Sequence, residues 1–452
     1  MNNSNTISQP MFSPRALVAL AVPIVLDALL AIAAGLVDSA MVSSAGEAAV
    51  SAISLVDSLN IMFILLFNAV TTGGVVVTSQ YIGSRDIDKA RTSANQLLYG
   101  STAIATVLML SLLCFIPQVI SLVYGRIDAA VFENAKSYFF WTLLGYPFFA
   151  VGSSCTALLR AQAKSAAALW LTGAVNILNV IGNALLIYGF DLGVAGAAIS
   201  TTFSRVIWAV VGLLMLHNKS LQVHFEKLLN LRLDMDIMKR VMTIGGANGL
   251  ENGLFQMGKI LVASLVSSFG TIAIAANSVA NTLCNIGWTT IGSFGTVLLT
   301  VVGQCMGARE VEQAKQYTKK IVNFCIILTV VLFGSVFLFR NQLVSIFDFG
   351  KEALDASAYI TGAGALLTIC SVYAWSFVPV AAYRAAGDTK YAVVLAVSSM
   401  FTFRVGLSYV LGHFLQMGLI GVWIGMWADW TCRTVFNYFR FRNGKWLTKK
   451  VI

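Results

Sequence analysis

The feature that most constrains this chain is a series of apolar segments of about 20 to 25 residues, the length at which a helix crosses a bilayer. Of its 452 residues, 58% are hydrophobic and 11% are charged, which is too much apolar surface for one soluble core. A helix satisfies its own backbone hydrogen bonds in lipid, whereas a barrel needs alternating strands of about ten residues, and the sequence has none. We therefore expect an all-α integral membrane protein.

The apolar pattern predicts twelve transmembrane helices. Lys and Arg gather in the connections after the even-numbered spans and in the C-terminal tail, which by the positive-inside rule places both termini in the cytoplasm. The same placement explains the net charge of +10, so we expect a bilayer and no nucleic acid as partner, with no obligate protein partner evident. The expected spans are 15–42, 52–81, 93–116, 134–156, 166–189, 194–216, 241–268, 273–305, 317–339, 356–380, 391–412 and 417–439.

An internal repeat organises the chain into two halves. At an offset of 224 residues, VTSQYIGSRDIDKA (77–90) falls on VVGQCMGAREVEQA (301–314), and Arg160 falls on Arg384. Each half holds an even number of spans, so both enter the membrane in one orientation, which predicts two six-helix lobes related by a pseudo-two-fold axis along the membrane normal. We expect an N-terminal lobe at 1–216, a cytoplasmic connection at 217–240, and a C-terminal lobe with a basic tail at 241–452.

Two carboxylates lie within the first span. Asp38 is roughly 16 Å deeper than Asp27 on nearly the same helix face. An intramembrane carboxylate costs about 2.5–3.5 kcal/mol unless it faces protein or water, which makes it a candidate functional group. The repeat pairs Asp27 with Glu251 but pairs Asp38 with Val262, so we assign ion coupling to Asp38. The alternative is a structural carboxylate that accepts hydrogen bonds from neighbouring helices.

Amides form a stripe on the fifth span. Asn176, Asn179 and Asn183 share one helix face at spacings of three and seven residues. Such amides can coordinate a cation or hydrogen-bond a carboxylate. They can equally join helices, at about 0.6 kcal/mol for each bond.

The second half carries its own polar face. Glu251, Phe255 and Lys259 follow helical spacing, with the two charges roughly 12 Å apart along the axis, and they suit a wet cavity between the lobes. A solvated Glu251 near the membrane surface is the alternative. Asn281 belongs to a similar stripe on the eighth span, and Arg404 is a further intramembrane charge.

Aromatic residues near Pro379 allow two interpretations. Tyr373 and Trp375 could stack on flat cationic ligands, or they could be packing residues. We interpret Asp429 and Arg433, at i and i+4, as an ordinary structural pair. The expected substrate cavity comprises Asp27, Asn68, Glu251, Phe255, Lys259, Asn281, Tyr373, Trp375 and Arg404.

Enzymatic chemistry has no support in the sequence. GxxxxGK[ST], HExxH and GxSxG do not occur, so a membrane-embedded enzyme is less favoured, as is a receptor, since no large soluble ligand domain is visible. The seven cysteines form no CxxC pair, and we expect no metal site beyond Na⁺ at Asp38.

Several short motifs, taken in order, resemble one transporter family. The chain is similar to bacterial multidrug and toxic compound extrusion (MATE) transporters, with DinF-like members as one branch to consider. The resemblance rests on LVDSAMVSSAG (36–46), SQYIGSRDIDKA (79–90), LLRAQAKS (158–165), the run 176–201, GLENGLFQMGK (249–259), VVGQCMGARE (301–310), YRAAGDTKY (383–391) and GLIGVWIG (418–425).

This resemblance implies a two-lobed antiporter in the bacterial inner membrane. It would expel organic, cationic compounds in exchange for H⁺ or Na⁺ and would need no cofactor. The family's acidic position on the first helix matches Asp38, its amide position matches Asn179, and its helix 6 threonine matches Thr201. The chain departs at Asn183, where DinF-like members often have a carboxylate, and around Tyr373, where another branch has an aspartate.

The predicted ion-coupling set is Asp38, Asn179, Asn183 and Thr201, and the coupling ion can be H⁺ or Na⁺. A second transport hypothesis is a flippase or exporter of a lipid-linked or anionic metabolite. Lys259 and Arg404 keep that hypothesis open, because a basic cavity would favour it.

Overall fold

The computed structural model describes residues 10–44, 46–125, 127–225, 233–347 and 349–452, and all its regular elements are helices. The expected connection 217–240 lies partly outside these residues, at 226–232. The helices of the first half are α1 (Pro14–Ser43), α2 (Glu47–Gly83), α3 (Ile87–Leu113), α4 (Ile116–Tyr124), α5 (Ala129–Leu144), α6 (Tyr146–Ala161), α7 (Ser165–Asn183), the π-helix η1 (Ala184–Gly189) and α8 (Gly193–Leu216).

The second half repeats this order of long helices. It contains α9 (Met235–Ser267), α10 (Thr271–Gly307), α11 (Val311–Leu338), α12 (Arg340–Val344), α13 (Lys351–Cys370), α14 (Tyr373–Ala385), α15 (Thr389–Ser399), the π-helices η2 (Met400–Leu407) and η3 (Val410–Phe414), α16 (Gly418–Asn443) and the 3₁₀ turn η4 (Lys445–Thr448).

Each of the twelve predicted spans coincides with one helix or one broken helix. Within the described ranges, nine helices are long and apolar enough to cross a membrane, and the bent pair α5 and α6 makes a tenth. The remaining two spans are α9 and α16, which carry intramembrane charges such as Glu251 and Asp429. The all-α, two-lobed fold class is confirmed.

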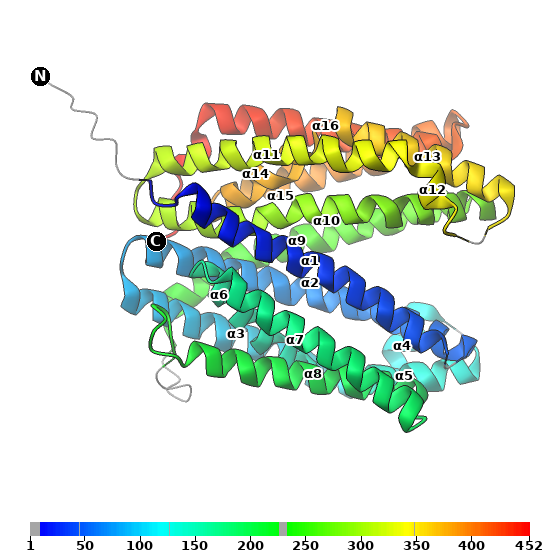
Figure 1. The fold of residues 1–452 in the computed structure, drawn as a ribbon, viewed down its shortest axis with the longest axis horizontal. Helices are drawn as coiled ribbons and strands as arrows, with labels where there is room; N and C mark the ends of the chain where they lie inside the picture. Colours follow the sequence, from blue (N-terminus) through cyan, green and yellow to red (C-terminus); the bar gives the residue numbers. More distant parts are fainter. Residues whose placement is uncertain (1–9, 45, 126, 226–232, 348) are drawn as a thin grey trace, which may run out of the picture.

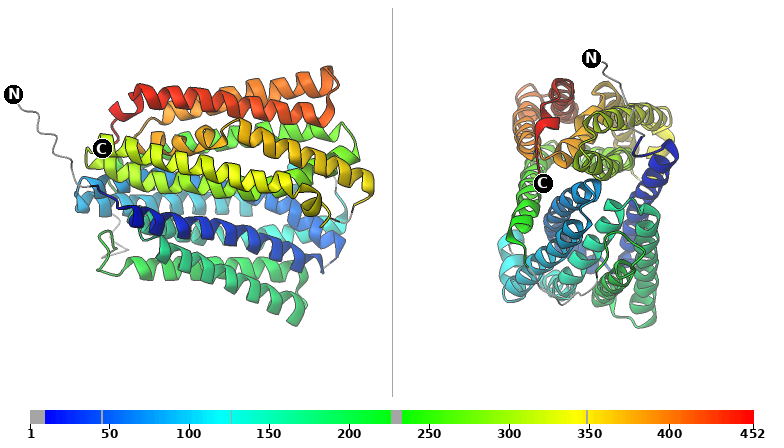
Figure 2. Two further views of the ribbon diagram at one scale, coloured as in Figure 1. Left: turned by 45° about the horizontal axis from the view of Figure 1, so that its top comes forward. Right: turned by 90° about the vertical axis from the view of Figure 1, so that its left-hand side faces the viewer.

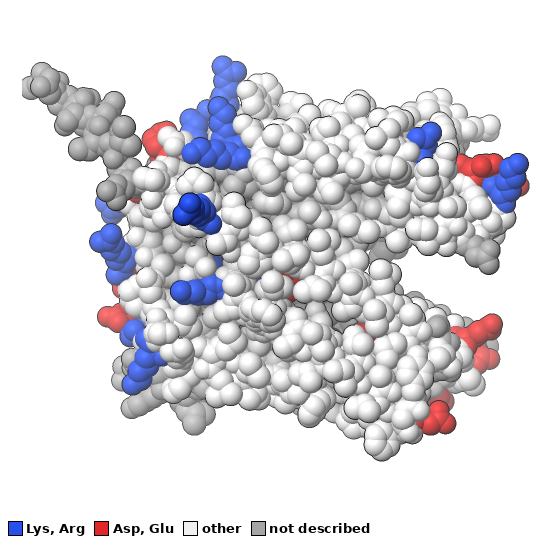
Figure 3. Space-filling model, viewed as in Figure 1, with Lys and Arg blue, Asp and Glu red and all other residues white. Residues whose placement is uncertain are grey.

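The helices form two bundles that lie side by side (Figures 1 and 2). Lys and Arg gather at the end where α1 begins and the C-terminus lies, whereas the space-filling view is hollowed between the bundles at the opposite end (Figure 3). We call these the basic end and the open end. The bundles are therefore in contact at the basic end and apart at the open end.

Helix α1 bridges the two bundles. One face of its first half packs against the second bundle, where Leu20 and Ile24 are buried in the apolar core. Phe12, just before α1, packs edge-on against Tyr317 of α11, with ring centroids 5.9 Å apart. Farther along, α1 contacts α7 of the first bundle. The helix that carries Asp38 thus touches both halves of the molecule, and Figure 1 shows it crossing between them.

The repeat is visible in the backbone. Arg85 and Arg309, which are equivalent in the repeat, both adopt left-handed conformations, with φ of 61° and 63°. Gly46 and Gly270 are likewise equivalent and have φ of 98° and 94°. Since left-handed conformations are uncommon for non-glycine residues, the two matching arginine turns show that the halves fold alike.

Candidate functional site

The first component of the site is a carboxylate surrounded by amides and a hydroxyl. Asn183 of α7 donates to Asp38 Oδ1 at 2.6 Å. With the Asn179 amide oriented to satisfy both neighbours, its nitrogen donates to Asp38 Oδ1 and Oδ2 at 3.2 and 3.1 Å, and its oxygen accepts from Thr201 Oγ1 at 3.3 Å. The structure therefore brings all four predicted ion-coupling residues together.

Local sequence places these groups. Asn179 and Asn183 are four residues apart and so lie on one face of α7. Gly182 allows α8 to approach, because a Cβ at that position would lie 2.3 Å from Ser200 Oγ. Directly after Asn183 the chain enters the π-helix η1, a geometry that occurs often at functional sites.

A second intramembrane carboxylate of the first bundle is Asp57 of α2. Asn60 and Tyr138 each donate to Asp57 Oδ1 at 3.2 Å, and Tyr146 donates to Asn60 Oδ1 at 2.7 Å. The predicted ion-coupling set omits Asp57. Two sequence signals could have identified Asp57. It is an intramembrane carboxylate, and its repeat equivalent is the predicted site residue Asn281.

The side chains around Asp38 offer the oxygen atoms that a small cation needs. Carboxylate, amide and hydroxyl oxygens are the donors that hard cations prefer, and a carboxylate can instead take a proton. Among the described residues, no group of three or more His, Cys, Asp or Glu side chains is placed to hold a metal ion. An ion at Asp38 would therefore depend on amide and hydroxyl oxygens in addition to carboxylate.

The other carboxylate of the first span has a different environment. Asp27 forms an ion pair with Arg160 of α6 and accepts a hydrogen bond from Thr172 of α7. Its side chain is 15% exposed. Asp27 is thus joined to neighbouring helices of its own bundle and is not among the residues that line the pocket of the second bundle.

The repeat equivalent of this ion pair exists in the second bundle. Arg384 of α14 contacts Glu251 of α9 at 2.7 Å, and both side chains are less than one-fifth exposed. Glu251 faces a small cavity of about 60 Å³ that it shares with Arg384, whereas Lys259 lies in a separate pocket. The shared cavity expected for Glu251 and Lys259 is therefore two cavities.

Breaking one of these pairs should destabilise the protein. We expect Glu251→Gln to cost about 3 kcal/mol, because it leaves the charge of the mostly buried Arg384 without its partner. The double variant Glu251→Gln with Arg384→Gln should be more stable than the single one. Thermal unfolding in detergent measures both. Glu133→Gln, in an exposed pair with Lys136, is the control and should change little; additive losses in the double variant would contradict the pairing.

The second component of the site is a pocket of about 400 Å³ in the second bundle. It lies among α9, α10, α14, η2 and α16. It includes the predicted cavity residues Phe255, Lys259, Asn281, Tyr373 and Arg404. The complete lining is Phe255, Lys259, Asn281, Thr282, Asn285, Trp288, Tyr373, Phe377, Arg404 and Trp430.

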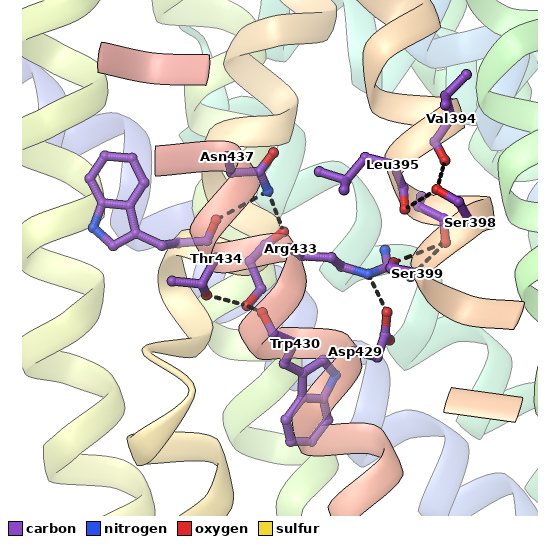
Figure 4. A network of polar contacts seen from close by, with 12 residues as sticks. Val394, Leu395, Ser398, Ser399, Asp429, Trp430, Arg433, Thr434 and Asn437 are labelled. Carbon is purple, nitrogen blue, oxygen red and sulfur yellow. Dashed lines mark hydrogen bonds and ion pairs between the residues drawn. The ribbon is translucent and has the colours of Figure 1, made fainter. Parts of the chain in front are cut away.

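Behind this pocket, α16 carries a buried polar network (Figure 4). Arg433 Nε donates to Asp429 Oδ1 at 2.8 Å, and its Nη2 donates to the Ala396 carbonyl at 2.9 Å. Asn437, one turn farther on, donates to the carbonyls of Trp375 and Ser376 at 3.2 and 3.0 Å. These bonds hold α16 against α14 and α15.

Besides Asp27 and Glu251, two more predicted cavity residues lie outside the pocket. Trp375 is 8% exposed and packs edge-on against Tyr438 and Phe441, with centroids 5.4 and 5.3 Å apart. It is therefore a packing residue of the core, which was the alternative interpretation. Asn68 is exposed on α2 and is not part of the pocket lining.

At the basic end, the bundles are joined by a pair of equivalent hydrogen bonds that we call the glutamine clamp. Gln80 of α2 donates to the Ala385 carbonyl at 2.6 Å, and Gln304 of α10 donates to the Ala161 carbonyl at 2.8 Å. Ala161 and Ala385 are the last residues of α6 and α14, whose final carbonyls have no partner within the helix. Each half thus completes a helix end of the other.

The clamp requires glycine. A Cβ on Gly83 would lie 2.0 Å from the Gln304 carbonyl oxygen, and a Cβ on Gly307 would lie 1.9 Å from that of Gln80. These glycines are equivalent in the repeat, so α2 and α10 approach each other symmetrically.

The arrangement matches known transporters over nearly the whole chain. It is 25% identical to the "Uncharacterized transporter YisQ" of Bacillus subtilis (strain 168), covering 99% of this chain and 98% of that protein. It is 23% identical to the "Probable multidrug resistance protein NorM" of Thermotoga maritima, covering 96% and 94%. A solved structure titled "Outward-facing conformation of a multidrug resistance MATE family transporter of the MOP superfamily" superposes with a TM-score of 0.87 at 20% identity, covering 95% and 96%.

The family comparison agrees with the internal repeat. The MatE family model matches twice, at residues 23–185 and 249–410, once in each half. These two segments contain both carboxylates of the first span and most of the pocket in the second bundle. The chain belongs to the MatE family.

Proposed function

We propose that this protein is a secondary active transporter that exports small organic compounds in exchange for H⁺ or Na⁺. The observation that carries the proposal is a difference between carboxylates. Asp27, Glu251 and Asp429 each pair with an arginine, whereas no ion pair compensates Asp38 in the part of the chain that the structure describes. A membrane carboxylate that has hydrogen bonds but no cationic partner is a candidate to bind a proton or a metal cation.

The relatives support the export part of the proposal. The Thermotoga maritima protein is named a probable multidrug resistance protein, and the solved structure is titled a multidrug resistance transporter. Small organic molecules are therefore the substrates we propose, and a single chain is the working unit.

The charge distribution supports an orientation. The basic end faces the cytoplasm by the positive-inside rule, which puts both termini inside and the open end outside (Figure 3). The bacterial relatives support the cytoplasmic membrane as the location. The structure then corresponds to an outward-open state in which the glutamine clamp closes the cytoplasmic end.

The two lobes supply alternating access. Residues 1–216 and 241–452 rock against each other, and the connection 217–240 joins them on the cytoplasmic side. Ion binding at Asp38 biases this equilibrium only if the two states bind the ion with different affinity. Helix α1 can link ion binding at Asp38 to the second bundle, since it carries Asp38 and also packs in the core of that bundle.

Transport by reconstituted protein tests the proposal. We expect proteoliposomes to move a fluorescent organic dye against its gradient when an imposed proton or sodium gradient supplies the driving force, and not when both gradients are collapsed by ionophores. The ion whose gradient drives transport is the coupling ion. Equal dye movement with and without the gradients would contradict secondary active transport.

A second candidate is export of a lipid-linked or anionic metabolite. The basic pocket around Lys259 and Arg404 favours an anionic group. Its volume of about 400 Å³ is in the range of drug-sized molecules and is small for a lipid-linked precursor. The pocket therefore favours a small anionic compound over a lipid-linked one.

A further inference from the structure

The pocket of the second bundle has an unusual charge balance. The ring of Phe255 lies 5.8 Å from Lys259 Nζ, 5.3 Å from Arg404 Cζ and 5.4 Å from Arg433 Cζ. The carboxylate near these three cations is Asp429, whose Oδ1 already accepts from Arg433. Among the described groups at this pocket, two positive charges thus remain without a carboxylate of their own.

Arg404 is the most costly of these charges. Its residue is 8% exposed, and its Nε has no hydrogen-bond partner among the described residues. A guanidinium cannot be deprotonated in a protein, so it cannot relieve this cost by becoming neutral. A buried cation needs an anion and acceptors for its N–H groups. The pocket beside Arg404 provides space for a ligand that brings both.

An aromatic wall faces the same space. Tyr373 stacks on Trp288 with ring centroids 6.4 Å apart and an interplanar angle of 28°. The ring centroid of Phe377 lies 4.7 Å from that of Tyr373. Trp430 meets Trp288 edge-on at 5.5 Å. Planar rings of a ligand can stack against such a wall. Asn281 and Asn285 add amide groups to the lining.

We infer that this pocket binds aromatic compounds that carry a carboxylate, including zwitterions. The carboxylate lies between Lys259 and Arg404, and the aromatic part lies against Trp288 and Tyr373. This inference rests on the proposed export function and names the substrate class for it. A purely cationic aromatic compound would meet two uncompensated positive charges and should bind more weakly.

The test uses one dye in two charge states. Tetramethylrhodamine has a free carboxylate and is zwitterionic, whereas its methyl ester is cationic and otherwise identical. Fluorescence anisotropy with purified protein in detergent gives both dissociation constants. We expect the wild type to bind the acid about tenfold more tightly than the ester, the effect of one charge-assisted hydrogen bond.

Substitutions assign this preference to the pocket. Lys259→Gln should weaken acid binding about tenfold and leave ester binding unchanged or tighter, whereas Lys259→Arg should keep the preference. Lys351→Gln makes the same chemical change on α13, outside the pocket lining, and should have no effect.

The outcomes separate this inference from the proposed function. If the ester binds as tightly as the acid, or if Lys259→Gln weakens both equally, the inference is wrong even when gradients drive dye export. If the acid binds with the expected preference but neither gradient moves it, the inference stands and the transport proposal fails.

Discussion

Replacing Asp38 with Asn lowers gradient-driven export about 100-fold, because a neutral amide neither binds a proton nor balances the charge of a bound Na⁺. The substitution is nearly isosteric, and its oxygen can still accept the hydrogen bond from Asn183 that the carboxylate accepts at 2.6 Å. We therefore expect the variant to fold and to bind dye. Dye uptake into proteoliposomes under an imposed proton or sodium gradient is the measurement.

Two comparisons make the Asp38 result specific. Glu312→Gln removes an exposed carboxylate from α11 and should leave export unchanged. Asp38→Asn should also abolish the effect of the coupling ion on dye affinity, since linkage between two ligands is reciprocal. If the Asn variant exports dye at the wild-type rate under both gradients, coupling resides elsewhere. Asp57 is then the next carboxylate to test.

Adding two methyl groups at the glutamine clamp opens the basic end. In the double variant Gly83→Ala with Gly307→Ala, each new Cβ would lie about 2 Å from a carbonyl oxygen of the opposite helix. Overpacking costs about 1–3 kcal/mol at each site, and 1 to 3 kcal/mol corresponds to about a 5- to 150-fold change in an equilibrium. We expect the population to leave the state in which α2 and α10 touch.

Hydrogen–deuterium exchange measures this opening. Segments 77–90 and 301–314 should exchange faster in the double variant, because the helix ends separate and their amides become exposed. Gly292→Ala is the matched control on α10, where a Cβ would have no neighbour within 4 Å. Unchanged exchange in the double variant would mean that the helices adjust locally without separating.

Much of the fold could be predicted because lipid imposes a simple pattern. A spanning helix needs about 20 apolar residues, and that signal survives in α9 and α16 despite their charges. The breaks between α5 and α6 and between α13 and α14 escaped prediction. At each break the segments on both sides are apolar, so the composition does not change there. The first break is a 47° bend between α5 and α6, and the second lies at the left-handed Val372 before α14.

The ion pairs show what a repeat can and cannot reveal. The offset correctly pairs Asp27 with Glu251 and Arg160 with Arg384 as equivalent positions. It does not reveal that each acid meets its arginine, because the partners are 133 residues apart and adjacency depends on helix packing. Two acids and two arginines at one offset are nevertheless a signal that could have suggested the pairs.

The candidate site could be predicted where one helix supplies a stripe. Asn179 and Asn183 follow from helical spacing, and the structure places them at Asp38. Trp375 and Tyr373 are two residues apart on α14 and so face different directions, one into the core and the other into the pocket. Spacing alone could not decide which one faces the pocket.

The glutamine clamp also bears on how such a chain arose. Gln80 reaches Ala385 and Gln304 reaches Ala161, which is the reciprocal pattern of an isologous dimer interface. A six-helix ancestor could have paired with its own copy through this contact before the two copies were fused. After fusion, the reciprocal contact keeps both copies alike at one end, whereas Asp38 and Arg404 show that their ligand-binding ends were free to diverge in charge.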